Sequence, residues 1–109
     1  MHELSITRNI VAIVGDRANG AKVTRVTLEV GTLSAVVPDA IRFCFDIVAR
    51  GTALEGAALD IIEVPGLARC RRCGGEVQFS ALVGGCPCGS GDMERLRGEE
   101  LTIKEMVTL

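Results

Sequence analysis

Four of the five cysteines in this 109-residue chain lie in two close pairs. Cys70 and Cys73 form a CxxC pair, and after twelve intervening residues Cys86 and Cys88 follow within Cys-Pro-Cys-Gly. Four thiolates at this spacing suit tetrahedral zinc, and a closed four-cysteine site leaves no coordination position for a substrate. The sequence therefore predicts a structural Zn(II) site, not a catalytic one.

Other uses of these cysteines are less well supported. A redox pair or free thiols would not need four cysteines at this spacing, and a rubredoxin-type iron site usually has an aromatic shell that this segment lacks. A Cys2His2 site is excluded, because the only histidine is residue 2. The second pair is shorter than a CxxC pair, so we expect the least regular geometry at Cys88. Cys44 is separate, and we interpret it as a small buried apolar residue.

The chain begins Met1-His2-Glu3, with its only histidine beside the terminal residue. Because histidine is bulky, Met1 is expected to escape trimming, which leaves an amine, a backbone amide and an imidazole within one short segment. Three such nitrogens favour square-planar Ni(II) or Cu(II) over zinc, with Glu3 or its amide completing or flanking the set. A terminal histidine is more often incidental, so this motif alone does not decide the function.

Periodic apolar residues predict the elements that position these motifs. Asn19-Gly20 is typical of a helix end, and Pro38 with Asp39 is typical of a first helical turn. We expect helices over Leu4–Ala18, with the buried stripe Ile6, Ile10, Ile13 and Val14, and from Pro38 to Gly51, with the stripe Ile41, Cys44, Phe45 and Val48. Strands are expected at Val23–Val30, Leu59–Val64 and Leu101–Val107.

The composition changes between the last two predicted strands. Residues 66–98 carry the four paired cysteines, many glycines and few large apolar side chains, so this segment needs a bound metal to become ordered. The predicted fold class is α+β: two helices on a three-stranded sheet with an inserted zinc-ribbon lobe. We expect residues 1–65 and 99–109 to form an α+β domain that carries the N-terminal metal-binding motif, and residues 66–98 to form a zinc-binding domain.

Composition and charge exclude several classes of protein. The chain is 48% hydrophobic with a mean hydropathy of +0.34, which predicts a folded protein, yet its apolar runs are too short for a membrane span or a secretory signal. We therefore expect a cytoplasmic protein that does not contact membranes. A net charge of −2 and the absence of Trp and Tyr argue against nucleic acid as a partner.

Two other classes of function compete with metal binding. One is a zinc-ribbon module that contacts nucleic acid or a protein complex, which a set of arginines supports: Arg69, Arg71, Arg72, Arg95 and Arg97. The other is an enzyme, for which the chain offers no second histidine, no nucleophile paired with a base and no phosphate-binding loop. We therefore predict that the protein is not an enzyme.

Five motifs occur together along the chain: Met-His-Glu at the start, Gly-Thr-Leu-Ser-Ala-Val-Val-Pro, the CxxC pair, Cys-Pro-Cys-Gly-Ser and Gly-Glu-Glu-Leu-Thr-Ile-Lys-Glu. In this combination, over essentially the whole chain, the sequence resembles the hydrogenase nickel-incorporation proteins of the HypA/HybF family. The family usually has Cys-Pro-x-Cys, so Cys86-Pro87-Cys88 is one residue shorter.

The resemblance implies a nickel metallochaperone that works with a partner GTPase. It would deliver Ni(II) to the apo large subunit of [NiFe] hydrogenase. The resemblance also implies that Met1-His2-Glu3 supplies the nickel site and that the four paired cysteines hold zinc. The sequence leaves open whether the chain is a monomer or a homodimer.

Overall fold

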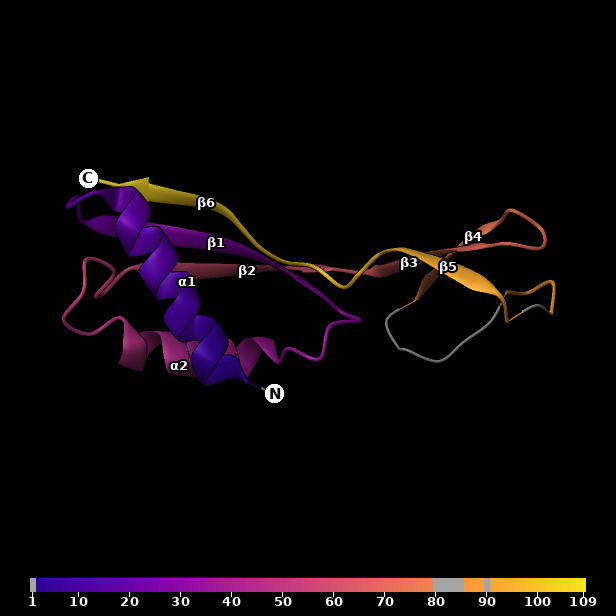
Figure 1. Cartoon of the computed structure of the whole chain (residues 1–109), viewed down its shortest axis with the longest axis horizontal. Helices are drawn as coiled ribbons and strands as arrows, with labels where there is room; N and C mark the ends of the chain where they lie inside the picture. Colours follow the sequence, from indigo (N-terminus) through magenta and orange to yellow (C-terminus); the bar gives the residue numbers. More distant parts are fainter. Residues whose placement is uncertain (1, 80–85, 90) are drawn as a thin grey trace. The chain divides into compact units, whose positions relative to one another are not determined.

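The computed structural model describes residues 2–79, 86–89 and 91–109, and the chain forms two compact units (Figure 1). The first unit comprises Met1–Glu29, Val36–Ile62 and Thr102–Leu109, and the second comprises Val30–Ala35 and Glu63–Leu101. The elements are α1 (Glu3–Ala18), β1 (Val23–Gly31), α2 (Pro38–Val48), β2 (Ala58–Val64), β3 (Gly66–Cys70), β4 (Glu76–Phe79), β5 (Met93–Arg97) and β6 (Leu101–Thr108).

Helix α1 begins at Glu3, one residue before the predicted start. The His2 carbonyl accepts the first helical hydrogen bond from the Ile6 N–H at 2.9 Å, and a carboxylate in the first turn is favoured by the positive end of the helix. The helix ends as predicted, because Asn19 adopts a left-handed conformation with φ of 50°.

The buried face of α1 differs in part from the predicted stripe. Ile10 and Val14 are buried as expected and Ile6 is half-buried, but the prediction for Ile13 is wrong, since 49% of it is exposed. Val14 is followed on the buried face by Ala18 and preceded by Val11 and Thr7, at steps of three and four. Ile13 lies about 100° around the helix from Val14, outside this face.

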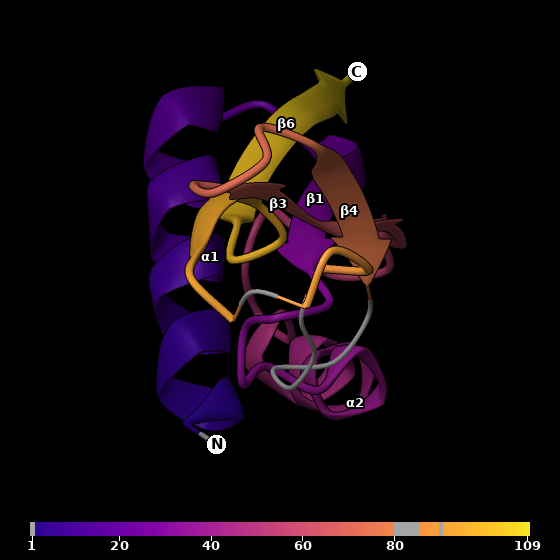
Figure 2. The same ribbon diagram turned by 90° about the vertical axis from the view of Figure 1, so that its right-hand side faces the viewer.

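Helix α2 begins at Pro38 as predicted and ends at Val48. Ile41 and Phe45 are buried, while Cys44 and Val48 are half-buried, so the predicted stripe is correct in position but not buried throughout. The two helices pack against each other, as Figure 1 shows and Figure 2 shows from the side. No helix in the described part of the chain is long and apolar enough to cross a membrane.

The first sheet has the order β2-β1-β6, which confirms the predicted three-stranded sheet. Its central strand, β1, supplies much of the core, because Val26, Leu28 and Val30 are at most 1% exposed. Burial of the central strand and of one face of each helix is the usual arrangement of an α+β core. The predicted fold class is therefore confirmed.

The lobe that carries the cysteines contains a second three-stranded sheet, with the antiparallel order β4-β3-β5. At its centre, Ala68 on β3 pairs with Val77 on β4 and with Arg95 on β5. The sequence predicted the lobe but not these strands. They are only four or five residues long, and β5 is largely exposed, so their apolar residues are too few for the sequence to predict strands.

Three glycines of the second unit allow backbone segments to come very close. A Cβ atom on Gly31 would lie 1.9 Å from the Gly98 carbonyl oxygen, and one on Gly98 would lie 2.6 Å from the Gly66 Cα. Gly98 also has a φ of +114°, which L side chains rarely adopt. At this crossing, only glycine fits without a backbone shift.

We expect Gly98→Ala to destabilise the protein by about 2 kcal/mol or more, because it combines a backbone clash with an unfavourable φ. Urea unfolding followed by far-ultraviolet circular dichroism measures the change. Gly91→Ala is the matched control, since a Cβ there meets no atom within 4 Å. Equal stability of the two variants would contradict the close approach.

Candidate metal centre

The second unit brings the four paired cysteines together. The sulfur atoms of Cys70, Cys73, Cys86 and Cys88 all lie within 4.8 Å of one another, with 3.7 Å between Cys70 and Cys88 and 3.4 Å between Cys73 and Cys86. Tetrahedral zinc with bonds of about 2.3 Å holds its sulfurs about 3.8 Å apart. The group is therefore consistent with structural zinc, and the short second pair still brings the Cys88 sulfur into the cluster.

Local backbone geometry orients these sulfurs. The N–H of Cys73 donates to the Cys70 sulfur at 3.5 Å, that of Gly75 to Cys73 at 3.4 Å, and that of Cys88 to Cys86 at 3.5 Å. Such bonds are the ordinary support of a thiolate ligand, because they stabilise its negative charge. Cys70 is fully buried at the end of β3, while Cys73 and Cys88 are exposed.

In the metal-free cluster, the same contacts shift the pKa values of Cys70 and Cys86 in opposite directions. The hydrogen bond from the Cys73 N–H lowers the pKa of the Cys70 thiol to about 6. The Cys88 N–H stabilises the Cys86 thiolate, but hydrogen bonds with the Cys88 and Cys73 sulfurs and burial outweigh it and raise the pKa of Cys86 to about 12. Binding of a metal by all four thiolates must therefore displace protons.

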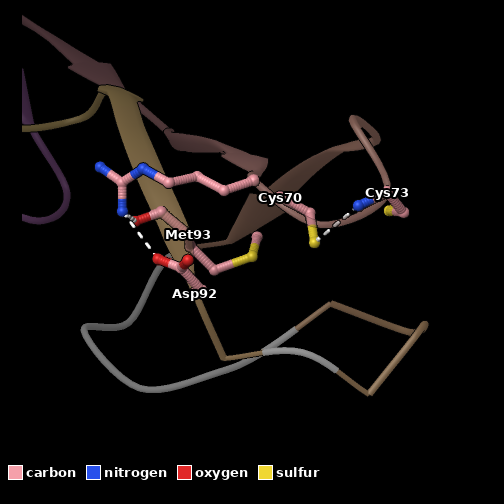
Figure 3. A network of polar contacts seen from close by, with 5 residues as sticks. Cys70, Cys73, Asp92 and Met93 are labelled. Atoms are coloured by element: carbon pink, nitrogen blue, oxygen red, sulfur yellow. Dashed lines mark hydrogen bonds and ion pairs between the residues drawn. The ribbon is translucent and has the colours of Figure 1, made fainter.

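Arg71 connects the first cysteine pair to Asp92, directly before β5, and to Met93, its first residue. Figure 3 shows this network of polar contacts, with Cys70, Cys73, Asp92 and Met93 labelled. The Arg71 guanidinium donates to the Asp92 carboxylate at 2.8 Å, and its backbone N–H donates to the Asp92 carbonyl at 3.0 Å. The hydrogen bond with Asp92 raises the pKa of Arg71. Sequence reasoning missed this pair, because nothing in the spacing links residues 71 and 92.

The arginines near the cysteines have partners other than the sulfurs. Arg69 pairs with Glu76 at 3.3 Å, and in the same lobe Arg95 pairs with Glu99 at 2.8 Å. Arg69 and Arg71, which lie on either side of Cys70, therefore both pair with carboxylates. These pairs also neutralise much of the basic surface that a phosphate backbone would need.

The N-terminal motif lies in the first unit, at the start of α1. His2 precedes the helix and is exposed, and the carboxylate of Glu3 accepts a hydrogen bond from the Val37 N–H at 3.2 Å. Val37 directly precedes α2, so Glu3 connects the starts of the two helices. The predicted terminal amine ligand belongs to Met1, which lies outside the described residues.

Comparisons with known proteins agree with these motifs. The family described as hydrogenase/urease nickel incorporation, metallochaperone, hypA matches residues 1–108. A protein from Nostoc punctiforme named hydrogenase maturation factor HypA is 61% identical over 106 residues, covering 97% of this chain and 94% of the relative. One of the same name from Geotalea uraniireducens is 50% identical over 107 residues, covering 97% of each.

Solved structures show the same fold. The solution structure of the nickel metallochaperone HypA from Helicobacter pylori aligns with a TM-score of 0.68 at 26% identity, covering 100% of this chain and 98% of the other. A second solution structure, of a HypA protein, aligns with a TM-score of 0.73 at 26% identity, covering 100% and 97%. From the match along the whole chain and the gathered cysteines, we conclude that the chain belongs to the hydrogenase/urease nickel-incorporation family of non-catalytic metallochaperones.

Proposed function

We propose that the protein binds Ni(II) as cargo and delivers it to the apo large subunit of [NiFe] hydrogenase. The family match over residues 1–108 carries this proposal, and the names of the relatives favour hydrogenase over urease as the recipient. The nickel-loaded protein, mixed with the apo large subunit, should transfer nickel that stays with the large subunit after separation. Failure of the His2→Ala protein to transfer nickel would support the assigned carrier site.

The proposed zinc ligands are Cys70, Cys73, Cys86 and Cys88. Their sulfur distances match a tetrahedral site, and their hydrogen bonds from backbone N–H groups favour the thiolate form. In this assignment residues 66–98 form the zinc-binding domain. Bound zinc supplies a cross-link in a segment with little apolar burial, and it has no part in the transfer of nickel.

The proposed nickel site is the segment Met1-His2-Glu3 in the domain of residues 1–65 and 99–109. The terminal amine, the His2 backbone amide and the His2 imidazole close adjacent chelate rings. The helical hydrogen-bond ladder begins with the Ile6 N–H and the His2 carbonyl, so it does not use the His2 N–H. The Glu3 carboxylate contacts Val37, which favours a flanking position for this side chain or ligation through its amide.

The proposed partners are a nickel-insertion GTPase of the same maturation pathway and the hydrogenase large subunit. A metal carrier must bind both the donor side and the recipient side of the transfer, and the family description places the chain among maturation factors. We place the protein in the cytoplasm, where four reduced cysteines can hold zinc instead of forming disulfides. Membranes and nucleic acids are not among the proposed partners.

A zinc-ribbon module that binds nucleic acid is the competing function, and a gel-shift measurement separates the two. We expect no shift of random duplex DNA at about 150 mM salt, because Arg69, Arg71 and Arg95 are paired with carboxylates. A nickel-free protein that shifts DNA with a steep dependence on salt would favour the competing function instead.

A further inference from the structure

The turn between α1 and β1 contains an asparagine–glycine pair that neither metal site uses. Asn19 and Gly20 are both exposed, and both have a left-handed backbone conformation, with φ of 50° and 89°. Asn19 is the only residue other than glycine with a positive φ in the described part of the chain. The pair therefore ends α1 at the surface, where water reaches both residues.

The two groups of this pair that can react with each other are free. Within the described residues, neither the Asn19 carboxamide nor the Gly20 N–H takes part in a hydrogen bond. The N–H groups of Asn19 and Ala21, on either side, donate to carbonyls of α1 at 3.2 and 3.0 Å. A Cβ atom on Gly20 would meet no atom within 4 Å, so the turn has open space in which its peptide group can rotate.

We propose that Asn19 is a site of spontaneous deamidation, with water as the only other reactant. The Gly20 nitrogen loses its proton and forms a bond with the Asn19 Cγ atom, while the carboxamide nitrogen leaves as ammonia. The product is a cyclic succinimide. Water then adds to one of its two carbonyl groups and breaks the C–N bond there, which gives aspartate at Cγ attack and isoaspartate at main-chain attack.

Asn9 is the other asparagine of the chain and serves as an internal control. It is also exposed, but it lies inside α1 and precedes Ile10, whose N–H belongs to the helical hydrogen-bond ladder. Ile10 is β-branched and only 5% exposed, so its own side chain crowds the nitrogen that would have to attack. The folded chain should therefore deamidate at Asn19 and preserve Asn9.

Both products weaken the end of α1. Aspartate at position 19 places a negative charge at the C-terminus of the helix, where the helix dipole is also negative. Isoaspartate adds a methylene to the main chain, which removes the left-handed cap and its hydrogen bond to the Asp16 carbonyl. Aged protein should therefore unfold at a lower urea concentration than fresh protein.

Peptide mapping of the zinc-loaded full chain, aged in mildly alkaline buffer below its unfolding temperature, measures the reaction. Trypsin cleaves after arginine and lysine, so the two asparagines fall in separate peptides, residues 18–22 and 9–17. Deamidation at Asn19 should be at least about tenfold faster than at Asn9, and it should speed up as pH rises, because the attacking nitrogen must lose its proton. Chromatography should separate an aspartyl and an isoaspartyl form of the first peptide. Equal rates at the two asparagines, or an unchanged Asn19, would overturn the proposal.

Asn19→Gly is the matched variant, because glycine keeps the left-handed turn but has no carboxamide. It should give no product in the peptide of residues 18–22, and its urea midpoint should stay constant during ageing while that of the wild type falls. Asn19→Asp separates the added charge from the altered main chain, and it should be destabilised less than the isoaspartyl form. An equal fall for Asn19→Gly and the wild type would show that ageing acts elsewhere in the chain and would contradict the proposed effect on α1.

Discussion

Replacing Cys73 by serine should release zinc and disorder the cysteine-containing lobe. Purified wild-type protein is expected to hold one zinc per chain, while the Cys73→Ser protein should lose it during dialysis. Binding of structural zinc contributes about 10 kcal/mol or more to the folding of small domains, and this lobe has few large buried side chains to replace it. Among the described apolar and cysteine residues of the lobe (residues 66–98), only three are buried: Ala68, Cys70 and Cys86.

Elemental analysis and backbone amide NMR spectra measure the two effects separately. Resonances of residues 66–98 should collapse in the Cys73→Ser protein, while those of the first unit persist, because its core of Val14, Leu28 and Phe45 contains no residue of the lobe. Cys44→Ser is the matched control, since Cys44 is half-buried on α2 and apart from the sulfur cluster. Full zinc content in Cys73→Ser, or an ordered lobe without zinc, would show that the assignment is wrong.

The parts of the fold that follow from local patterns could be predicted from the sequence. Helical periodicity located α1 and α2, alternation located the first sheet, and the spacing of the cysteines predicted that Cys70, Cys73, Cys86 and Cys88 converge. Each of these patterns depends on neighbours within a few residues or on a metal that requires its ligands to be adjacent. Such constraints are visible without knowledge of the tertiary structure.

Contacts between distant residues could not be predicted in this way. The bond from the Val37 N–H to Glu3 spans 34 residues, and the pair of Arg71 with Asp92 spans 21. Charged residues of these types have many partners of opposite sign along the chain, so only the tertiary fold selects one. Strands β4 and β5 were missed for a related reason, since each has at most five residues and is ordered by its register against β3.

Untagged protein should bind one Ni(II) at its N-terminus, and His2→Ala should weaken binding by at least about a hundredfold, because the variant loses a ligand of the chelate. His2 is exposed, and only its backbone carbonyl takes part in the helical ladder, so the substitution should preserve the fold and the zinc content. Isothermal titration with Ni(II) measures affinity, and the visible absorption of a square-planar nickel complex reports the geometry. Binding should weaken as pH falls, since the amine, the imidazole and the amide all bind protons in competition with nickel.

Moving the terminal amine separates this site from any other nickel site in the chain. A Gly-Ser-Gly-Ser extension before Met1 converts the Met1 amine into an ordinary amide and places the new amine too far from His2 to close adjacent chelate rings. It should therefore abolish the square-planar complex, although His2 and Glu3 are unchanged. The same Gly-Ser-Gly-Ser extension added after Leu109 is the matched control and should leave nickel binding intact. The two extended proteins have the same composition and the same cysteines, so zinc or adventitious thiol sites cannot distinguish them. Equal nickel affinity of the native, His2→Ala and N-terminally extended proteins would place the carrier site elsewhere and remove the residue-level basis of the proposed function.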